Sequence, residues 1–200
     1  MNLIIKEHAL LETPKLKRQP VIIKVNDFTE VAVTTFSKEL TEAINSGQPI
    51  IPIVIDSYGG EVYSLLAMID LIEQCKVPIA TIIEGKAMSC GAFLASCGTP
   101  GLRFMGPNAT ALIHEVAKMA WGKLPELRAS VDQAQKLNDK VFSLLNKNCN
   151  RSPGTVEELI HANGHADLYL DAEQALTLGL IDFIRIPVLN VDIKVQFEFK

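Results

Sequence analysis

Hydrophobic residues occur along the chain in two alternating spacings, which predict strands and helices in turn. Short apolar runs rich in Ile and Val predict buried strands over residues 21–25, 50–55, 77–83, 102–105 and 110–113. After the first strand, apolar residues recur every three or four positions and predict a helix that begins near Asp27 or Thr29 and ends at Gly47. A second helix of this kind is predicted after Gly60. This order predicts an α/β fold with a largely parallel sheet and flanking helices.

The longest helical spacing covers residues 124–148 and is carried by Leu124, Leu127, Val131, Ala134, Leu137, Val141 and Leu144. A domain of this size cannot enclose so long a helix, so we expect it to project and to contact a partner. A short helix rich in small residues is predicted over residues 89–97. Thr155 with Glu158 predicts a capping box for another helix, and Asp171 and Gly179 predict the two ends of a further one.

The two ends of the chain differ from its centre. Residues 1–20 are expected to form an irregular arm, in which two prolines flank a small basic cluster. In residues 191–199 apolar and polar side chains alternate strictly, which predicts a strand within an extension over residues 187–200. An exposed strand of this kind favours pairing with a neighbour. The remaining residues, 21–186, are expected to form a single domain.

Composition and charge exclude several classes of protein. Hydrophobic residues make up 48% of the chain, and its mean hydropathy is +0.20, so we expect other subunits to cover much apolar surface. The net charge of −4 argues against partners such as nucleic acid or an anionic membrane. We expect neither a secretory signal nor a bilayer span. The four cysteines lack metal-ligand or disulfide spacing, so reduced thiols in a cytosol and no metal site are expected.

Two glycine-containing segments follow predicted strands, where α/β proteins place their sites. One is Gly59-Gly60, and the other spans residues 85–92; neither matches a nucleotide-binding fingerprint. In the second segment Ser89 begins a helix among small residues. Small neighbours leave room for a carbonyl group, and the free N–H groups at a helix start favour a developing oxyanion. Ser89 is therefore a candidate nucleophile, although a serine at this position can equally serve only as an N-cap.

A serine nucleophile needs a base, and the base needs a group that fixes its tautomer. His114 ends the predicted strand over residues 110–113, and Asp167 precedes the helix that Asp171 is expected to cap. Each of Ser89, His114 and Asp167 thus lies at the end of an element. The three could converge on one face as a catalytic triad, while a lone histidine in an apolar strand is also compatible with a core position.

Four segments, in this order, resemble the signature blocks of ClpP, the serine peptidase subunit of ATP-dependent Clp proteases: SYGGEVYSLLAMIDLI, GKAMSCGAFLASCG, LIHEV and ADLYLDAEQALTLGLID. The resemblance covers about residues 21–182. It implies a ClpP/crotonase-like fold in which Ser89 is the nucleophile, His114 the base and Asp167 the acid. The backbone N–H groups of Gly60 and Cys90 would form the oxyanion hole. Extended peptides would bind beside Gly59, Gly60, Glu61 and Val62.

The resemblance also implies an assembly. The helix over residues 124–148 corresponds to the handle that joins two rings, so two stacked seven-membered rings around a chamber are expected. A Clp-type AAA+ ATPase or a ClpP paralogue is the implied partner. ATP would be used only by that ATPase, and the peptidase itself would need no cofactor. The expected location is a bacterial cytoplasm, a phage-infected cell or a plastid stroma.

The chain departs from the family pattern at four positions near the predicted site. Tyr58 replaces a proline, Lys86 a glutamine and Cys90 a methionine, and Leu168 replaces the arginine that takes part in a contact between rings. Since the oxyanion hole uses a backbone N–H, the change at Cys90 leaves that donor in place.

Three other functions remain open at this stage. A catalytically silent subunit that assembles with an active ClpP paralogue would explain Leu168 and the unusual arm. A phage-head maturation or signal-peptide-type serine protease would share the chemistry and differ in substrate. An enoyl-CoA hydratase-type enzyme of the crotonase fold would use paired turn N–H groups on a thioester, but the chain has no evident pair of catalytic glutamates for it.

Overall fold

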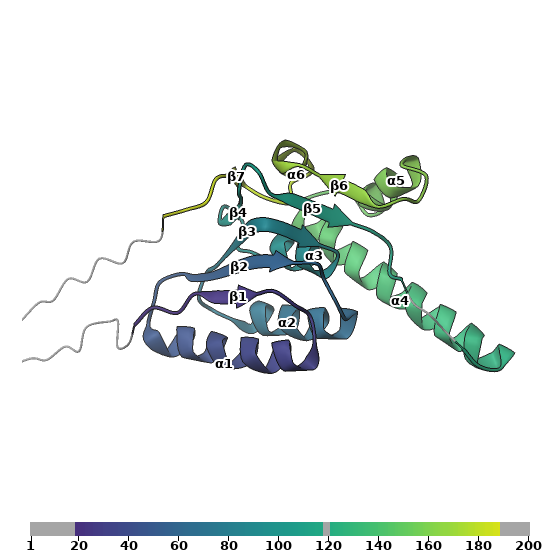
Figure 1. The fold of residues 1–200 in the computed structure, drawn as a ribbon, viewed down its shortest axis with the longest axis horizontal. Helices are drawn as coiled ribbons and strands as arrows, with labels where there is room; N and C mark the ends of the chain where they lie inside the picture. Colours follow the sequence, from purple (N-terminus) through teal and green to yellow (C-terminus); the bar gives the residue numbers. More distant parts are fainter. Residues whose placement is uncertain (1–18, 118–120, 189–200) are drawn as a thin grey trace, which may run out of the picture.

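A computed structural model describes residues 19–117 and 121–188 of the chain (Figure 1). In these residues the strands are β1 (Ile23–Val25), β2 (Ile51–Ser57), β3 (Ile79–Met88), β4 (Arg103–Met105), β5 (Thr110–Ile113), β6 (Leu168–Leu170) and β7 (Phe183–Ile184). The helices are α1 (Glu30–Ser46), α2 (Val62–Gln74), α3 (Cys90–Ser96), α4 (Leu124–Asn148), α5 (Thr155–Ala162) and α6 (Ala172–Leu178). The predicted alternation of strands and helices is therefore confirmed.

Parallel pairing dominates the sheet. Strands β1, β2, β3, β4 and β7 are hydrogen-bonded in that order, each parallel to the next. Strand β3 changes partner along its length, since residues 81–83 pair with β4 and residues 86–88 pair with β5. Only β6 is antiparallel, on β5. Figure 1 shows α1 and α2 side by side along one face of the sheet. The prediction of an α/β fold with a largely parallel sheet is confirmed.

The local signals for α1 and α6 act as predicted. The Thr29 hydroxyl accepts a hydrogen bond from the N–H of Ala32 and caps α1, and Gly47 ends it with a left-handed φ of 78°. Asp171 caps α6 through the N–H of Gln174, and Gly179 ends that helix. These caps fix where the two helices begin and end, and thereby the positions of the loops that connect them to the strands.

The long helix α4 has the predicted bounds and projects from the rest of the molecule (Figure 1). Its C-terminal half is in the core, where Phe142 meets Phe93 of α3 edge to face, with ring centroids 5.5 Å apart. In its N-terminal half Leu124 and Val131 are 62% and 66% exposed. The apolar spacing thus continues onto a part of the helix where the described chain leaves large apolar side chains exposed.

The structure corrects the predicted end of β3. Sequence analysis placed residues 85–92 in a turn, but the strand continues to Met88 and only Ser89 separates it from α3. Gly85 has a φ of 72° and lies between the part of β3 that pairs with β4 and the part that pairs with β5. The glycine allows a bend where the strand changes partner and does not end it.

The capping box predicted for Thr155 and Glu158 is wrong. Gly154, with a φ of 87°, occupies the N-cap position of α5, and Thr155 is already the first helical residue. The Thr155 hydroxyl instead donates to the Ser152 carbonyl at 2.8 Å. The predicted arm over residues 1–20 and the strand over residues 191–199 lie almost entirely outside the described residues, so both stay predictions.

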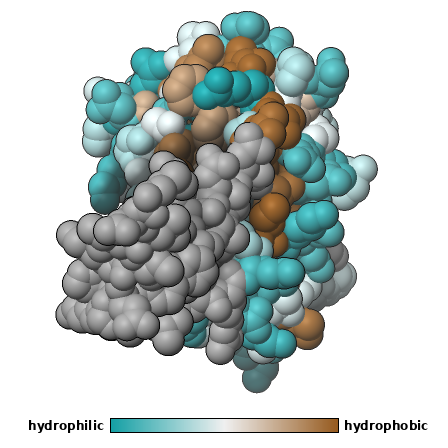
Figure 2. Space-filling model, turned by 90° about the vertical axis from the view of Figure 1, so that its left-hand side faces the viewer, coloured by the Kyte–Doolittle hydropathy of each residue, from teal (hydrophilic) through white to brown (hydrophobic). Residues whose placement is uncertain are grey.

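Apolar side chains also reach the surface. Figure 2 shows hydrophobic residues gathered in a band on the end of the molecule that is at the left in Figure 1. Among the described residues, Ile22, Ile186 and Val188 are large apolar side chains with substantial exposure. The expectation that other subunits cover such surface stays a prediction. No helix in residues 19–117 or 121–188 has the length and apolar character that crossing a membrane requires.

Candidate active site

Ser89 lies in the sharp turn between β3 and α3. Its backbone has φ 52° and ψ −120°, a conformation that residues other than glycine seldom adopt, and its N–H donates to the Leu112 carbonyl at 2.8 Å. Such strain persists only where the surrounding structure imposes it, and it is concentrated at functional sites. The hydroxyl makes no capping hydrogen bond to α3. Ser89 thus occupies the N-cap position without using its side chain as a cap.

The Gly59-Gly60 turn lies directly against Ser89, and both glycines are required by space. A Cβ atom on Gly59 would lie 2.8 Å from the Ser89 Cβ, and one on Gly60 would lie 2.6 Å from the Phe28 carbonyl oxygen. Both residues have positive φ, 100° and 153°. The buried Ser57 hydroxyl accepts a hydrogen bond from the Gly59 N–H at 3.0 Å and holds the turn. The chain can therefore approach Ser89 closely enough to present a backbone N–H beside it.

Cys90 joins the two segments that were predicted to form the oxyanion hole. Its thiol donates to the Gly60 carbonyl at 3.3 Å, and its side chain is buried. Burial raises the pKa of the Cys90 thiol, so the group stays neutral and can donate. Cys90 is the first residue of α3, where a backbone N–H has no partner within the helix. This thiol contact was not foreseen from the sequence, which identified only the backbone N–H.

His114 follows β5 and lines the same pocket as Ser89. Its Nδ1–H donates to the backbone carbonyl of Glu115. With the proton on Nδ1, the other ring nitrogen, Nε2, carries the lone pair that a general base needs. In this conformation the Glu115 carbonyl therefore holds His114 in the tautomer that proton abstraction by Nε2 requires.

Asp167 precedes β6, and the β5–β6 ladder determines where it lies. Ile113 pairs with Leu168 in the antiparallel register, so the next pair along the two strands is His114 with Asp167. Asp167 is exposed, and its backbone carbonyl accepts from the Asn163 side chain at 3.2 Å. In the described part of the chain no hydrogen bond joins Ser89 to His114 or His114 to Asp167. The fold brings the three segments to one edge, while the side chains are not linked.

A pocket of about 380 Å³ connects these residues. Ser89, Cys90, His114 and the turn residue Gly60 line it together with Tyr58, Glu61 and Val62. The rest of the lining is apolar and comes from three helices and from the segment after His114: Leu65, Phe93, Val116, Ala117 and Val141. Gly59 lies against Ser89 but is not among the residues that line the pocket. The pocket thus combines a hydroxyl, an imidazole and an apolar wall. This combination suits a ligand that has an apolar group next to a polar, reactive group.

Two of the departures from the family pattern contact one another at this pocket. The Lys86 ammonium lies 4.4 Å from the centre of the Tyr58 ring and 2.6 Å from the Asp56 carboxylate. The hydrogen bond to Asp56 raises the pKa of Lys86. Tyr58 lines the pocket, and Lys86 contacts it from outside the lining, so the two substituted positions are in direct contact.

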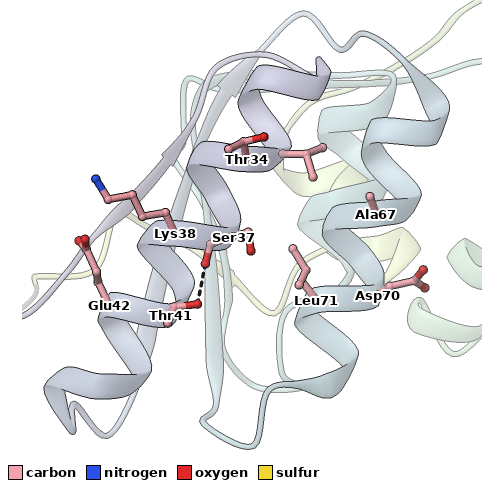
Figure 3. Close-up of a pocket in the computed structure, with 9 residues that line it drawn as sticks. Thr34, Ser37, Lys38, Thr41, Glu42, Ala67, Asp70 and Leu71 are labelled. Carbon is pink, nitrogen blue, oxygen red and sulfur yellow. Dashed lines mark hydrogen bonds between the residues drawn. The ribbon is translucent and has the colours of Figure 1, made fainter.

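A larger, open groove lies between α1 and α2, away from these residues (Figure 3). It is lined by polar and small apolar side chains, and Figure 3 shows the Thr41 hydroxyl bonded to the Ser37 carbonyl, at 2.8 Å. No residue singled out from the sequence lines it. It provides no nucleophile with a base beside it, so the smaller pocket is the candidate active site.

Comparison with known proteins finds similarity to proteases. A sequence model of the Clp protease family matches residues 10–186. The ATP-dependent Clp protease proteolytic subunit 1 of Nocardia farcinica (strain IFM 10152) is 31% identical over 133 residues, which are 66% of this chain and 66% of that protein. The match thus spans just under two thirds of the length of this curated relative.

Proposed function

This chain belongs to the Clp protease family, and from that premise we propose that it is a serine-type endopeptidase subunit of a self-compartmentalising protease. The observation that carries the proposal is the position of Ser89. It lies in a strained turn at the start of α3, with a hydroxyl that does not cap the helix, in the same pocket as His114. Its substrates would be peptide bonds of unfolded proteins or peptides.

In the proposed reaction the Ser89 oxygen attacks the peptide carbonyl while His114 Nε2 takes the hydroxyl proton. The carbonyl oxygen becomes an oxyanion, which the N–H groups of Gly60 and Cys90 stabilise. His114 then returns the proton to the leaving amine, and the C–N bond breaks to give an acyl-enzyme. Water, deprotonated by His114, attacks the ester and restores Ser89. No metal or organic cofactor enters these steps.

Asp167 would orient His114 and stabilise its protonated form. The β5–β6 register supports this role, because one further pair extends the ladder to His114 and Asp167. In the described conformation the Glu115 carbonyl accepts from Nδ1 instead. We propose that the Asp167 carboxylate replaces this carbonyl in the active assembly, where neighbouring subunits hold the segment before β6 in place.

The substrate would bind as an extended strand beside residues 59–62. The apolar wall made by Leu65, Phe93 and Val141 favours an apolar side chain at the residue whose carbonyl is attacked. Tyr58, which lines the pocket, and Lys86, which lies against its ring, would contact the neighbouring residues of the peptide.

The assembly we propose is two stacked seven-membered rings joined through α4. The exposed Leu124 and Val131 on its projecting half support a contact between copies of the chain, because such side chains are normally covered. A Clp-type ATPase would unfold substrates and consume the ATP. The proposed location is a bacterial cytoplasm, a plastid stroma or a phage-infected cell.

The direct test replaces Ser89 by alanine and measures cleavage of a fluorogenic peptide with an apolar residue before the scissile bond. Ser89→Ala should lose at least about a thousandfold in kcat/KM, since the nucleophile is absent. Ser37→Ala, on α1 and outside the pocket, is the matched control and should cleave at the parent rate. A fluorophosphonate should label the parent and not Ser89→Ala. An S89A protein that cleaves like the parent would refute the assignment.

The silent-subunit alternative is favoured by one observation. Leu168, in place of the family arginine, packs partly buried against the core and leaves that position without a charged group for a contact between rings. Native mass spectrometry separates the two functions. A homomeric ring that cleaves peptide supports the peptidase, and a chain that assembles and cleaves only with an active paralogue supports the alternative. Membership of the Clp protease family argues against the acyl-CoA enzyme.

A further inference from the structure

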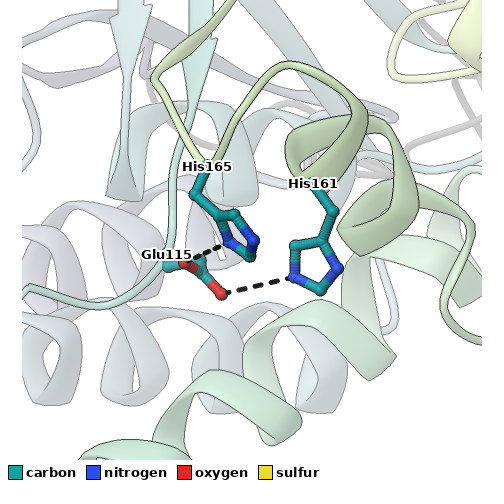
Figure 4. Close-up of side chains that lie close together, drawn as sticks. All are labelled: Glu115, His161 and His165. Atoms are coloured by element: carbon teal, nitrogen blue, oxygen red, sulfur yellow. Dashed lines mark ion pairs between the residues drawn. The ribbon is translucent and has the colours of Figure 1, made fainter.

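Three side chains from two distant parts of the chain meet beside the candidate active site. Glu115 follows His114, while His161 and His165 come from the end of α5 and the turn after it (Figure 4). His161 Nε2 is 3.7 Å and His165 Nδ1 is 3.6 Å from the Glu115 carboxylate. The two imidazole rings are 4.2 Å apart between centroids. All three residues are exposed, so the cluster is open to solvent.

The backbone after α5 explains why the two histidine rings lie close together. The N–H of His165 donates to the Ile160 carbonyl at 3.0 Å, and the N–H of Gly164 donates to the His161 carbonyl at 2.9 Å. These two bonds, with Gly164 at φ 72°, form a Schellman motif that reverses the chain. His165 itself has a φ of 58°. The reversal carries its ring back over His161, so two imidazole nitrogens face the same carboxylate.

The donor set and its spacing suit a transition metal. One ligand atom from each of the three residues lies within 4.8 Å of the others. Ligand atoms of a tetrahedral zinc ion, each about 2.0–2.1 Å from the metal, are about 3.3 Å apart. The separations of 3.7 Å from His161 Nε2 and 3.6 Å from His165 Nδ1 are slightly longer than this value and end on different oxygens of the Glu115 carboxylate. Because all three side chains are exposed, rotation can bring one carboxylate oxygen and both nitrogens to the required spacing. Nitrogen donors favour zinc and its neighbours over Mg²⁺ or Ca²⁺.

Nothing else in the described residues neutralises the Glu115 carboxylate. No lysine or arginine of residues 19–117 or 121–188 forms a salt bridge with it. A divalent metal ion would supply positive charge beside this carboxylate, because it bonds to neutral imidazoles and to carboxylates.

We propose that Glu115, His161 and His165 bind a divalent transition metal of the zinc type, with water completing the coordination. The site links the residue after His114 to a residue two positions before Asp167. It therefore ties together the two segments that border the candidate triad. Metal binding itself requires no peptidase activity, so the site is independent of the proposed function.

The test uses the full chain carrying Ser89→Ala, freed of metal with a chelator and kept reduced. Zinc affinity is measured by competition with a chromophoric chelator, and the visible spectrum is recorded after Co²⁺ is added. We expect one zinc ion per chain and the absorption of Co²⁺ bound by nitrogen and oxygen. Glu115→Gln, His161→Asn and His165→Asn should each weaken zinc binding at least tenfold.

Two control variants keep the test specific. Glu158→Gln removes an exposed carboxylate from the same helix, and His8→Asn removes the histidine nearest the start of the chain; both should bind zinc like the parent. Circular dichroism without metal should be the same for all variants. The proposal is overturned if His161→Asn and His165→Asn bind zinc as tightly as the parent, if His8→Asn abolishes binding, or if the Co²⁺ spectrum shows thiolate ligands.

Discussion

Two charged clusters join distant segments of this chain, and they differ in how completely their groups are paired. Arg103 of β4 is buried and donates from Nε and Nη2 to the Asp182 carboxylate at 3.0 and 2.6 Å. Its Nη1 donates to the carbonyls of Asn148 and Gly179 at 3.0 and 2.8 Å. In the cluster of Glu115, His161 and His165, by contrast, the closest contacts are 3.6 and 3.7 Å and all groups are exposed.

The difference indicates two different roles. Every charged atom of the Arg103 cluster has a direct partner, and the hydrogen bonds from Arg103 outweigh the effect of burial and lower the pKa of Asp182. Such a cluster fixes β4 against the ends of α4 and α6. The Glu115 cluster has nearly the right geometry for bonding but no short bonds, so its groups are available to a ligand. We therefore infer a structural role for the Arg103 cluster, in which every charged atom is paired. For the Glu115 cluster, whose groups lack short bonds, we infer a binding role.

The largest expected effect is on stability, from loss of Arg103. Arg103→Met leaves Asp182 Oδ1 and two carbonyls without their donor, whereas Oδ2 keeps the backbone N–H groups of residues 101 and 103. The variant should lower the free energy of unfolding by about 3 kcal/mol. Urea denaturation at one fixed protein concentration measures the change, because assembly makes stability depend on concentration.

A second salt bridge provides the matched control for Arg103→Met. Lys86 and Asp56 are also 2.6 Å apart, but their side chains are 25% and 50% exposed, against 9% and 18% for Arg103 and Asp182. Lys86→Met should therefore lower the stability much less than Arg103→Met does, because solvent screens this pair. Equal losses in the two variants would mean that burial and the additional carbonyl contacts of Arg103 do not matter, contrary to the comparison.

Much of the fold was predictable because its signals are local. The bounds of α4 follow from one apolar stripe, and the ends of α1 and α6 follow from capping residues whose hydrogen bonds lie within one turn. The end of β3 was not predictable, because Gly85 marks an exchange of strand partners, which no local pattern encodes. Pro52 is tolerated in β2 because β1 begins to pair one residue later, at Ile53.

The candidate site was predictable only as a set of segments. Glycine turns and element ends indicated Ser89, His114 and Asp167, and the fold brings their segments to one edge. The orientation of His114 toward the Glu115 carbonyl depends on torsion angles that sequence does not specify. The cluster of Glu115 with two histidines was missed, because it requires both the β5–β6 pairing and the reversal after α5.

An intermediate effect on stability is expected when acid protonates Asp182 and weakens its ion pair with Arg103. The pKa of Asp182 in the folded protein lies below its ordinary value of 3.8, so this carboxylate stabilises the fold fully above that value. The stabilisation is lost as the pH falls through the lower, folded value. Asp182→Asn lacks this contribution at every pH. The stability difference between parent and Asp182→Asn should thus be largest near neutral pH and narrow below about pH 4. A difference that stays constant to pH 3 would contradict the shift.

The smallest effect is expected where the groups are least paired. Without metal, Glu115→Gln should change the free energy of unfolding by less than about 0.5 kcal/mol, since exposed ion pairs of this length contribute little. Chelator-treated parent and variant, compared by urea denaturation at equal concentration, measure this directly. Added zinc should then stabilise the parent and leave Glu115→Gln almost unchanged, because only the form that binds the ion gains from it. A loss of several kcal/mol in the metal-free variant would show that Glu115 supports the fold itself, and the contrast with the Arg103 cluster would no longer hold.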